Sequence, residues 1–502
     1  MISPLICWSL GLVLASEPPP ESQESQESQE SQESLESLER AVQGVPPGGG
    51  CPWLQGVILD ERRVITVRAE DGAIIEESSR QQRALTAEIH LGWPTGRIRV
   101  ALDPSGPAPL DEALRLELQR QRARCDPDPI PPKRPGPAPE VGPQRDLSGA
   151  PALPDPSLPR AIAAATAAAL AQRRASGVWV TAELGRWRWI PIEGPARIEP
   201  IDQLIVRIWA REQAEGGRIG TDQILFLGRA SHRIAVEPLE AAARLLSGQL
   251  QAWSALPIPG EGYVGPVLFE AAASADLFQR QLARGLMDPP GEAPPSLALQ
   301  QRVFPRGWSV IDDPDRLIDA PAAFRVDREG EPGARVELVV DGVVTDHLTS
   351  WASGPGIRSN GHARGEGGAP AAMPSNLLIQ PHRVSSEARI HRRARRAARR
   401  RGLDRYLVIR RLQDPSLRPE GASEPIEMSW VLRDGSRQPI RGLALASLGR
   451  LPLGDPLAAG RIERYAVLMT LPGQPVGPVE GVPVLLSAPS VLLDGVSLVR
   501  VP

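Results

Sequence analysis

The sequence predicts a two-domain α+β protein. Its 502 residues exceed the roughly 250–300 at which a single hydrophobic core stops growing, and 41% of them are hydrophobic, enough for packed cores. Stretches that alternate with a period of two, typical of half-buried strands, are interspersed with Ala-rich and Leu-rich stretches of helical period. Pro and Gly number 54 and 47, above average usage but below the level of a chain disordered throughout.

Composition excludes several classes of protein. The net charge of −3 argues against a general nucleic-acid binder. Three cysteines are too few for a disulfide-dense scaffold or for several zinc sites. Lys133 is the only lysine, so chemistry that needs a lysine is excluded unless this residue supplies it. No run of 18 apolar residues follows the N-terminus, and we expect no internal transmembrane segment.

The N-terminus is typical of an export signal followed by a spacer. Residues 2–14 are apolar except for two serines, and small residues precede a cleavage point after Ala15 or Ser16. We expect residues 1–16 to be a signal peptide; a buried N-terminal segment is the alternative, because no Lys or Arg precedes the apolar run. Residues 17–50 then form a low-complexity acidic linker. Residues 17–40 contain eight Glu and one Arg, a net −7, so the remainder carries about +4.

Export would also decide which cysteines remain and whether they can form a disulfide. Cleavage of the signal would remove Cys7 and leave Cys51 and Cys125 in an oxidising compartment. A disulfide between them would close a long loop and could stabilise the fold by about 4 kcal/mol on the chain-entropy model. Two unpaired buried thiols are the alternative.

The first predicted domain, residues 51–256, begins with a β-hairpin. Residues 57–69 have the pattern of a strand, and Asp71-Gly72 has turn chemistry. A second strand follows, in which apolar residues alternate with polar ones: Leu85, Ala87, Ile89 and Leu91. Residues 127–159 contain 12 prolines in 33 positions, which predicts an exposed insertion rich in polyproline II structure.

Two helices and several strands complete this domain. Pro159 opens an Ala-rich helix to about Ala175, and a second helix runs from Pro238 to about Trp253. Strands are expected between them at 178–181, 187–190, 204–210 and 224–226. Arg and Trp alternate over residues 186–189; a strand with tryptophans inward and arginines outward is favoured over a stacking platform for single-stranded nucleic acid.

The second predicted domain, residues 257–502, carries a series of motifs. A Gly-Pro-Val strand at 263–270 leads into an Ala-rich helix from about Ala272 to Leu286. Further motifs follow in order: Trp308–Pro314, Asp327–Pro332, Val339–Val344, Ser359–Gly365, Pro374–Leu377 and Ala488–Leu493. In order and spacing they resemble the TldD/PmbA family, also called modulator of DNA gyrase, whose best-studied members are metallopeptidases or their partners. The resemblance implies an N-terminal mixed sheet with helices and a β-rich C-terminal domain.

The zinc site of TldD-type members is missing from the matching positions. Those members carry His-Glu-x-x-x-His on the helix after the Gly-Pro-Val strand, where two imidazoles and a later thiolate hold zinc and the Glu is the general base. Here Gln279 and Arg284 stand at the His positions and Arg280 at the Glu position. Residues 470–481 contain no Cys. The resemblance therefore implies a chain like the PmbA-type members, with no metal and no other cofactor.

Other residues offer weaker candidates for a site. No pair among the six histidines has a metal-ligand spacing, and no Gly-x-Ser-x-Gly elbow is present. His362 lies in a Gly-rich stretch, where loop solvation or a structural hydrogen bond is favoured. Residues 391–401 contain seven arginines. A solvated helix face is favoured there over a site for nucleic acid or another anionic surface.

The predicted function is therefore an exported, non-catalytic subunit of a metallopeptidase family that binds polypeptide. We expect a homodimer, or a heterodimer with a TldD/PmbA relative, and no nucleic-acid partner. Peptide is expected to add as a strand beside Val267–Phe269 and the loop 359–368, and the contacts are assigned to Ser359, Asn360, Gly361 and Gly365. An active metallopeptidase with unrecognised ligands and a stand-alone envelope binding or structural protein remain as alternatives.

Overall fold

The structure is a computed structural model. It describes residues 38–43, 53–90, 97–102, 110–121, 157–170, 175–191, 195–232, 234–288, 295–316, 320–353, 357–365, 370–412, 424–446, 453, 455–469 and 481–501. The expected signal peptide, Cys51, Cys125, most of the Pro-rich insertion and residues 470–480 lie outside this range.

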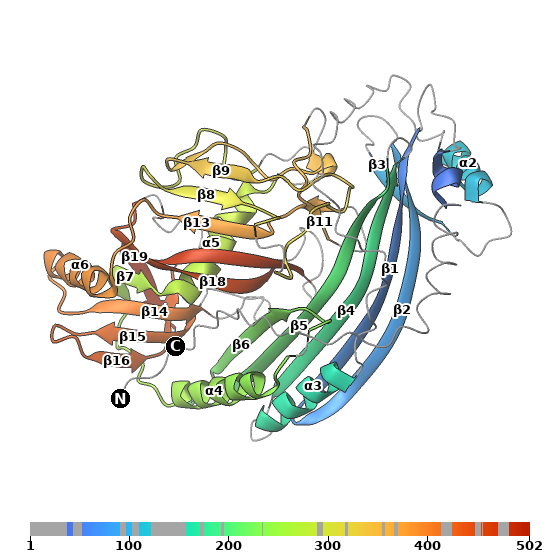
Figure 1. Cartoon of the computed structure of the whole chain (residues 1–502). Helices are drawn as coiled ribbons and strands as arrows, with labels where there is room; N and C mark the ends of the chain where they lie inside the picture. The colour runs from blue at the N-terminus through green and yellow to red at the C-terminus, as the bar shows by residue number, and fades with distance from the viewer. Residues whose placement is uncertain are drawn as a thin grey trace.

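The N-terminal domain is built on a six-stranded antiparallel sheet in the order β3-β2-β1-β4-β5-β6. Its strands are β1 (Trp53–Glu70), β2 (Ala73–His90), β3 (Arg97–Leu102), β4 (Ser176–Pro191), β5 (Arg197–Gln213) and β6 (Ile219–Gly228). Asp71 and Gly72 join β1 to β2 with φ of 48° and 87°, as a two-residue hairpin turn requires. The predicted first hairpin is confirmed, and the long strands curve along one side of the molecule (Figure 1).

Helices cover one face of this sheet at both ends. Near the β1–β2 turn, α3 (Ser157–Leu170) and α4 (Glu237–Ser254) pack on alternate residues of β1, β4 and β5, which form one buried cluster with Trp253. At the far end, α2 (Leu110–Gln121) and a helical turn at 38–43 pack on Val57, Leu59 and Ile190. Val42 is fully buried there. This helical turn lies inside the range 17–50 that the sequence suggested as linker.

Two sequence expectations for this domain need correction. The separate strands at 178–181 and 187–190 are parts of one strand, β4, because β1 and β5 pair with it along its length. The tryptophans of the Arg-Trp repeat are buried as expected, but Arg188 is only 5% exposed and Arg186 pairs with Glu61 at 3.0 Å. Both faces of β4 are therefore covered at this point.

The C-terminal domain is a mixed sheet of 11 strands. Its main order is β10-β9-β8-β13-β19-β7-β14-β15-β16, and β17 and β18 also pair with β19. The bounds are β7 (Tyr263–Phe269), β8 (Ser309–Asp312), β9 (Val336–Val340), β10 (Val343–Val344), β13 (Asn376–Gln380), β14 (Tyr406–Leu412), β15 (Pro425–Val431), β16 (Arg437–Ile440), β17 (Leu443–Leu445), β18 (Ala458–Met469) and β19 (Val482–Arg500). A separate pair is formed by β11 (Ala363–Arg364) and β12 (Ala371–Ala372).

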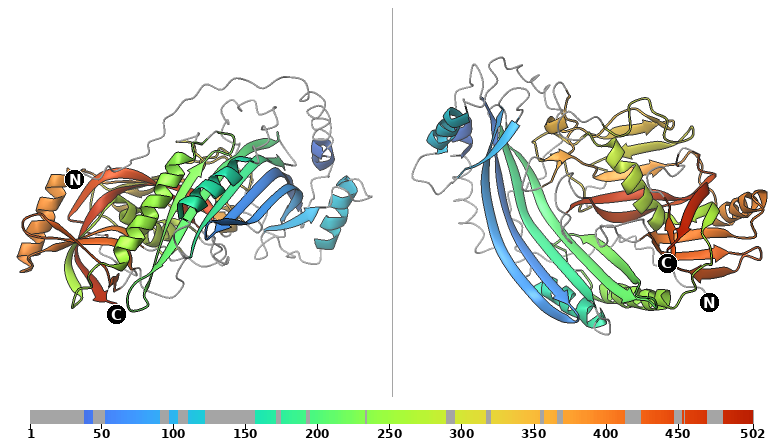
Figure 2. Two further views of the ribbon diagram at one scale, coloured as in Figure 1. Left: turned by 90° about the horizontal axis from the view of Figure 1, so that it is seen from below. Right: turned by 180° about the vertical axis from the view of Figure 1, so that it is seen from behind.

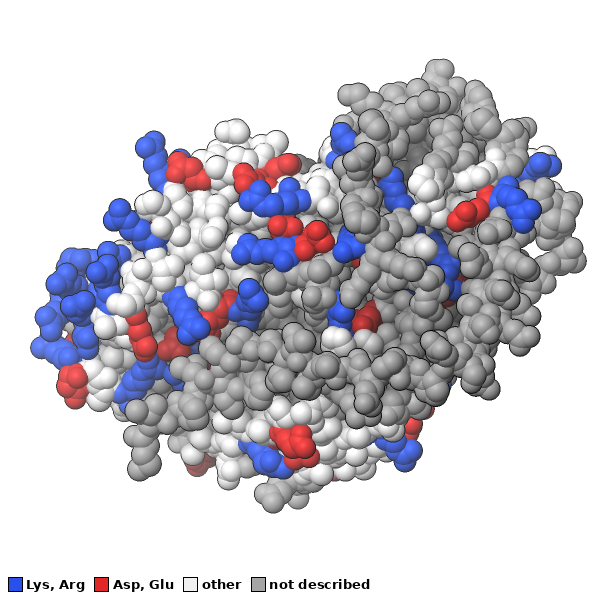
Figure 3. Space-filling model, viewed as in Figure 1, with Lys and Arg blue, Asp and Glu red and all other residues white. Residues whose placement is uncertain are grey.

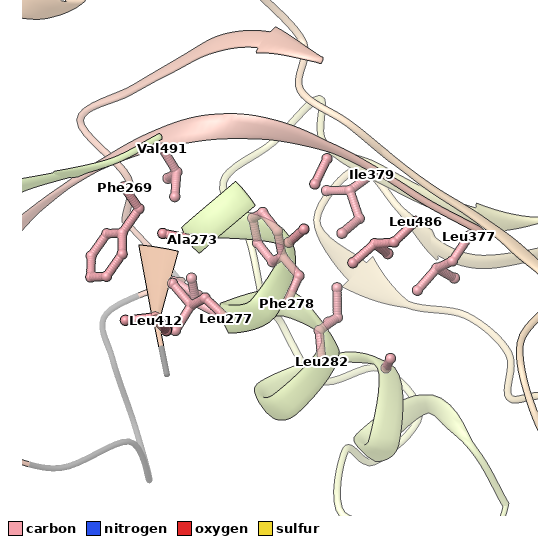
Figure 4. Close-up of a cluster of buried hydrophobic side chains, with 14 of the residues drawn as sticks. Phe269, Ala273, Leu277, Phe278, Leu282, Leu377, Ile379, Leu412, Leu486 and Val491 are labelled. Atoms are coloured by element: carbon pink, nitrogen blue, oxygen red, sulfur yellow. The ribbon is translucent and has the colours of Figure 1, made fainter. Parts of the chain in front are cut away.

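The central strands of this sheet bury both faces. Phe269, Leu486 and Val491 point toward α5 (Ala271–Gln281), whose Leu277 and Phe278 complete the larger core (Figure 4). On the opposite face, alternate residues of the same strands meet α6 (Glu387–Arg400). Short 3-10 turns, η2 (Ala283–Leu286) and η3 (Trp351–Ser353), lie in the connections. No helix within the described residues is long and apolar enough to cross a membrane.

Candidate functional site

The end of α5 is where the family resemblance implies a zinc site. The helix runs directly from central strand β7 and ends at Gln281, with Leu282 as its C-cap. The Gln279 side chain donates a hydrogen bond to the carbonyl of Leu468, the penultimate residue of β18, at 3.2 Å. The expected helix to Leu286 is thus an α-helix to Gln281 followed by a 3-10 turn.

The residues at this position do not fit zinc. Gln279 presents a neutral amide, which is not one of the usual zinc ligands, and its nitrogen is bonded to Leu468. Arg280, which is half-buried, cannot lose a proton to act as ligand or base. Arg284 lies beyond the end of the helix and is exposed, so it does not converge with Gln279. Among the described residues no three His, Cys, Asp or Glu side chains are grouped as a metal site would need.

Strand β7 does not offer an edge for an added peptide strand. It pairs with β19 on one side and β14 on the other, and Val267 and Phe269 are fully buried. A peptide therefore cannot add beside Val267–Phe269, and this part of the sequence expectation is wrong. An unpaired edge is found on β2, because β3 pairs only with Leu85–His90, and residues 73–84 pair with β1 alone among the described strands.

The loop at Ser359–Gly365 is part of the interior rather than an open binding surface. Ser359 is 7% exposed, and the Asn360 side chain accepts from the Thr349 amide at 2.9 Å and donates to the His347 carbonyl at 2.8 Å. Gly361 has φ of +74°, and a Cβ there would lie 2.0 Å from the Pro332 carbonyl oxygen. Gly365 is also buried. The described part of the loop thus supports the fold, and a side chain at Gly361 cannot be accommodated unless the backbone shifts.

A buried carboxylate organises the base of this loop. Asp312, at the end of β8, is fully buried; it accepts hydrogen bonds from the Ser375 hydroxyl at 2.8 Å and the Ser375 amide at 3.0 Å, and contacts His362 Nε2 at 3.0 Å. The other His362 nitrogen, Nδ1, lies 3.0 Å from the carbonyl oxygen of Asn360. The imidazole therefore contacts the carboxylate and the loop, as the structural interpretation of this histidine predicts.

The acidic turn at Asp327–Pro332 connects this loop to the other domain. The Asp327 carboxylate accepts hydrogen bonds from the amides of Glu329, Glu331 and Ala363, each at 2.9 Å. Burial raises the pKa of Asp327 to about 7 despite these donors. Arg328 lies 3.7 Å from Asp60 of β1, and its guanidinium is 5.8 Å from the Trp187 ring.

A buried acid of the N-terminal domain, Glu199 of β5, stabilises the same contact between the two domains. The Glu199 carboxylate accepts hydrogen bonds from the Arg325 and Val326 amides at 3.1 and 3.2 Å. Val326 packs against Trp187 and Trp189. Burial raises the pKa of Glu199 to about 7, against a model-compound value of 4.5. No feature of the sequence pattern distinguishes Glu199 from a solvated glutamate, so its role was not predicted.

The arginine-rich segment forms the exposed face of α6. Ile390, Ala394, Ala397 and Ala398 are buried against the sheet, whereas most of the arginines are exposed and gather at one end of the molecule (Figure 3). The helix predicted at 391–401 is confirmed, with bounds Glu387–Arg400. Between α6 and the β15–β16 turn lies a groove of about 470 Å³ that the sequence did not indicate.

Comparisons with known proteins agree with this architecture. Residues 262–446 match the sequence pattern of the PmbA/TldA metallopeptidase C-terminal domain. No curated protein matches the chain. The fold is similar to that of TldE from Thermococcus kodakarensis, with a TM-score of 0.61 and 16% identity over 93% of this chain and 100% of that one.

Two further solved structures, each described as a modulator of DNA gyrase, are also similar. The one from Thermotoga maritima has a TM-score of 0.61 and 14% identity, covering 93% of this chain and 100% of that one. The one from Bacteroides thetaiotaomicron has a TM-score of 0.58 and 13% identity, covering 93% and 99%. The fold defines a mixed α+β protein with a metallopeptidase-like C-terminal domain. Residues 262–446 therefore carry the PmbA/TldA metallopeptidase C-terminal domain, and the fold of the whole chain is similar to that of TldE and of the two gyrase modulators.

Proposed function

We propose that this chain is a non-catalytic, polypeptide-binding member of the TldD/PmbA family. The observation that carries the proposal is the end of α5, where Gln279 is bonded to Leu468 and Arg284 is exposed beyond the helix. The guanidinium group of Arg280, next to Gln279 in the chain, is a further reason why this position does not suit a divalent cation. Hydrolysis through a zinc-bound water requires a ligand set and a base, and neither is found at the described positions.

Metal content and hydrolysis test the catalytic half of the proposal. The purified full chain should hold far less than one zinc per molecule after dialysis, and it should leave a library of unstructured peptides uncleaved. The triple variant Gln279→His, Arg280→Glu, Arg284→His is a useful comparison, because it should gain zinc affinity without full activity. Stoichiometric zinc in the unaltered chain, with cleavage that chelation abolishes, would show an active metallopeptidase instead.

Polypeptide binding is assigned to the open edge of β2. An added strand would use main-chain hydrogen bonds, tolerate many sequences and need no metal. The edge residues Glu76, Glu77 and Arg80 are exposed, and charges of this kind also protect edges against unspecific pairing. Binding is therefore expected to be in the micromolar range, roughly −8 kcal/mol, and to favour extended peptides.

A photo-crosslinking amino acid placed at Ile75 tests this assignment. Ile75 is 52% exposed on the β2 edge, and Val264 is 56% exposed on the central strand β7. A labelled extended peptide should be captured at position 75 and not at the matched position 264. Equal capture at both positions, or at neither, would leave a structural role as the better interpretation.

Association and location belong to the same proposal. We propose that the chain forms a homodimer or a heterodimer with a TldD/PmbA relative, and that residues 1–16 direct its export. Light scattering of the purified chain, and co-purification with a co-expressed relative, test the first point. N-terminal sequencing of protein from the cell envelope tests the second, because export predicts a mature chain that begins near Ser16 or Glu17.

A further inference from the structure

The groove beside α6 is lined by basic and hydrogen-bonding side chains from three elements. Helix α6 contributes His391, Arg392 and Arg395, β14 contributes Tyr406, and β16 contributes Arg437. Its volume of about 470 Å³ lies within the usual range of small-ligand sites. The only acidic residue in its lining is Glu387, at the rim, with 82% of its side chain exposed.

The two helix arginines of this lining are not neutralised. Neither Arg392 nor Arg395 has an acidic partner among the described residues, whereas Arg437 pairs with Glu270 at 3.2 Å. A second hollow adjoins the first through Arg395 and adds Arg399, Arg405 and Arg433, with one acid, Asp404. The positive charge is thus continuous from the groove to the exposed end of α6.

The floor of the groove carries two groups that are neutral near pH 7. His391 Nδ1 and the Tyr406 hydroxyl are 2.5 Å apart, and both side chains are largely buried. Burial, together with the nearby Arg437, lowers the pKa of His391, and burial raises that of Tyr406 to about 12. His391 Nε2 is 3.7 Å from Glu387. One of the two polar hydrogens joins His391 to Tyr406, and the floor can donate the other to an anion held by the arginines.

The charge pattern of α6 works against the stability of the helix. Arg392 has Arg389 three residues before it and Arg395 and Arg396 three and four residues after it. Like charges at these spacings are neighbours on a helix surface and are destabilising. Only Arg399 and Arg400, in the last turn, are favourably placed for the helix dipole. A helix face that only had to be soluble could carry acidic and basic side chains together.

We propose that this groove is a binding site for a phosphate group, held between Arg392, Arg395 and Arg437 with His391 at its floor. Guanidinium groups recognise phosphate oxygens through paired N–H donors. The groove is open to the outer arginines, so a ligand with a second phosphate would contact Arg399 as well. The phosphate could be that of a soluble metabolite or of a lipid headgroup, and the same residues would bind either.

Titration calorimetry of the full chain with pyrophosphate tests the site, and two double variants provide the comparison. Arg392→Gln with Arg395→Gln removes two charges that line the groove. Arg389→Gln with Arg396→Gln removes two charges from the same helix outside both hollows. The first pair should weaken binding at least tenfold, about 1.4 kcal/mol, and the second less than threefold. Both pairs should melt at or above the temperature of the unaltered chain, because each relieves like-charge repulsion.

Binding to lipid vesicles distinguishes a lipid headgroup from a soluble phosphate compound. Vesicles that contain phosphatidylglycerol should sediment with the chain, with the same dependence on Arg392 and Arg395, if a lipid headgroup is the ligand. Pyrophosphate binding without vesicle binding assigns a soluble ligand. The proposal is overturned if neither probe binds, or if the two double variants weaken binding equally, since that result shows only diffuse attraction by the helix.

Discussion

Replacement of Gly361 by alanine tests the role of the Ser359–Gly365 loop as a support of the fold. The residue has φ of +74°, where a side chain costs about 1–2 kcal/mol. A Cβ would lie 2.0 Å from the Pro332 carbonyl oxygen, whereas ordinary contact begins at 3.4 Å. The two segments would therefore have to separate by 1.4 Å (3.4 minus 2.0).

This separation would lengthen or break hydrogen bonds that join the same two segments. The amide of Ala334 donates to the Asn360 carbonyl at 3.2 Å, and the amide of Ala363 donates to Asp327 at 2.9 Å. A buried polar group left without its partner costs about 1–3 kcal/mol. Added to the cost of the backbone conformation, this loss should destabilise the variant by about 2–5 kcal/mol.

Gly402→Ala is the matched control. Gly402 has φ of +73° at the end of α6, but nothing lies within 4 Å of a Cβ there, so only the backbone term of about 1–2 kcal/mol applies. In Gly361→Ala, amide hydrogen exchange at Glu331 and Ala363 should be faster by two to three powers of ten, since each 1.4 kcal/mol is a factor of about ten. Equal destabilisation by the two variants would refute the steric argument and return the loop to the candidate binding elements.

Three further outcomes are expected. Because burial raises the pKa of Glu199 to about 7 from an ordinary 4.5, its contribution to stability is full below pH 4.5 and is lost as pH rises through 7; Glu199→Gln should flatten this part of the thermal stability profile, and an unchanged slope would contradict the assignment. Asp312→Ala should lower the melting temperature far more than Asp315→Ala, since Asp312 is fully buried and Asp315 is 66% exposed. If export is right, Cys51 and Cys125 should be disulfide-bonded, and two free thiols in the denatured, unreduced protein would count against the bridge.

Much of the local structure follows from the sequence because the signals act over a few residues. The alternation of apolar and polar residues indicated which face of β1 and β2 is buried, and Asp71-Gly72 indicated the turn between the two strands. Helix α4 has its predicted bounds to within a residue, with Pro238 at its start. The arginines of α6 are placed by the helical period of Ile390, Ala394 and Ala397.

The sequence by itself also indicated the resemblance to the TldD/PmbA family and the residues that stand at the zinc positions of α5. Motif order requires no coordinates, and the chemical nature of Gln279, Arg280 and Arg284 excludes the expected ligands wherever the helix lies. The sequence could not show that β7 is central, because pairing with β14 and β19 joins segments more than a hundred residues apart. An apolar strand has the same pattern at an edge and at the centre of a sheet.

Only the tertiary structure decided which polar residues are buried and which face a groove. Asp312, His362 and Ser375 are distant in sequence and share one hydrogen-bonded cluster. Glu199 has its raised pKa because the segment at Arg325 and Val326 of the other domain covers it. Burial and pKa depend on what lies across the fold from a side chain, and no local pattern encodes those neighbours.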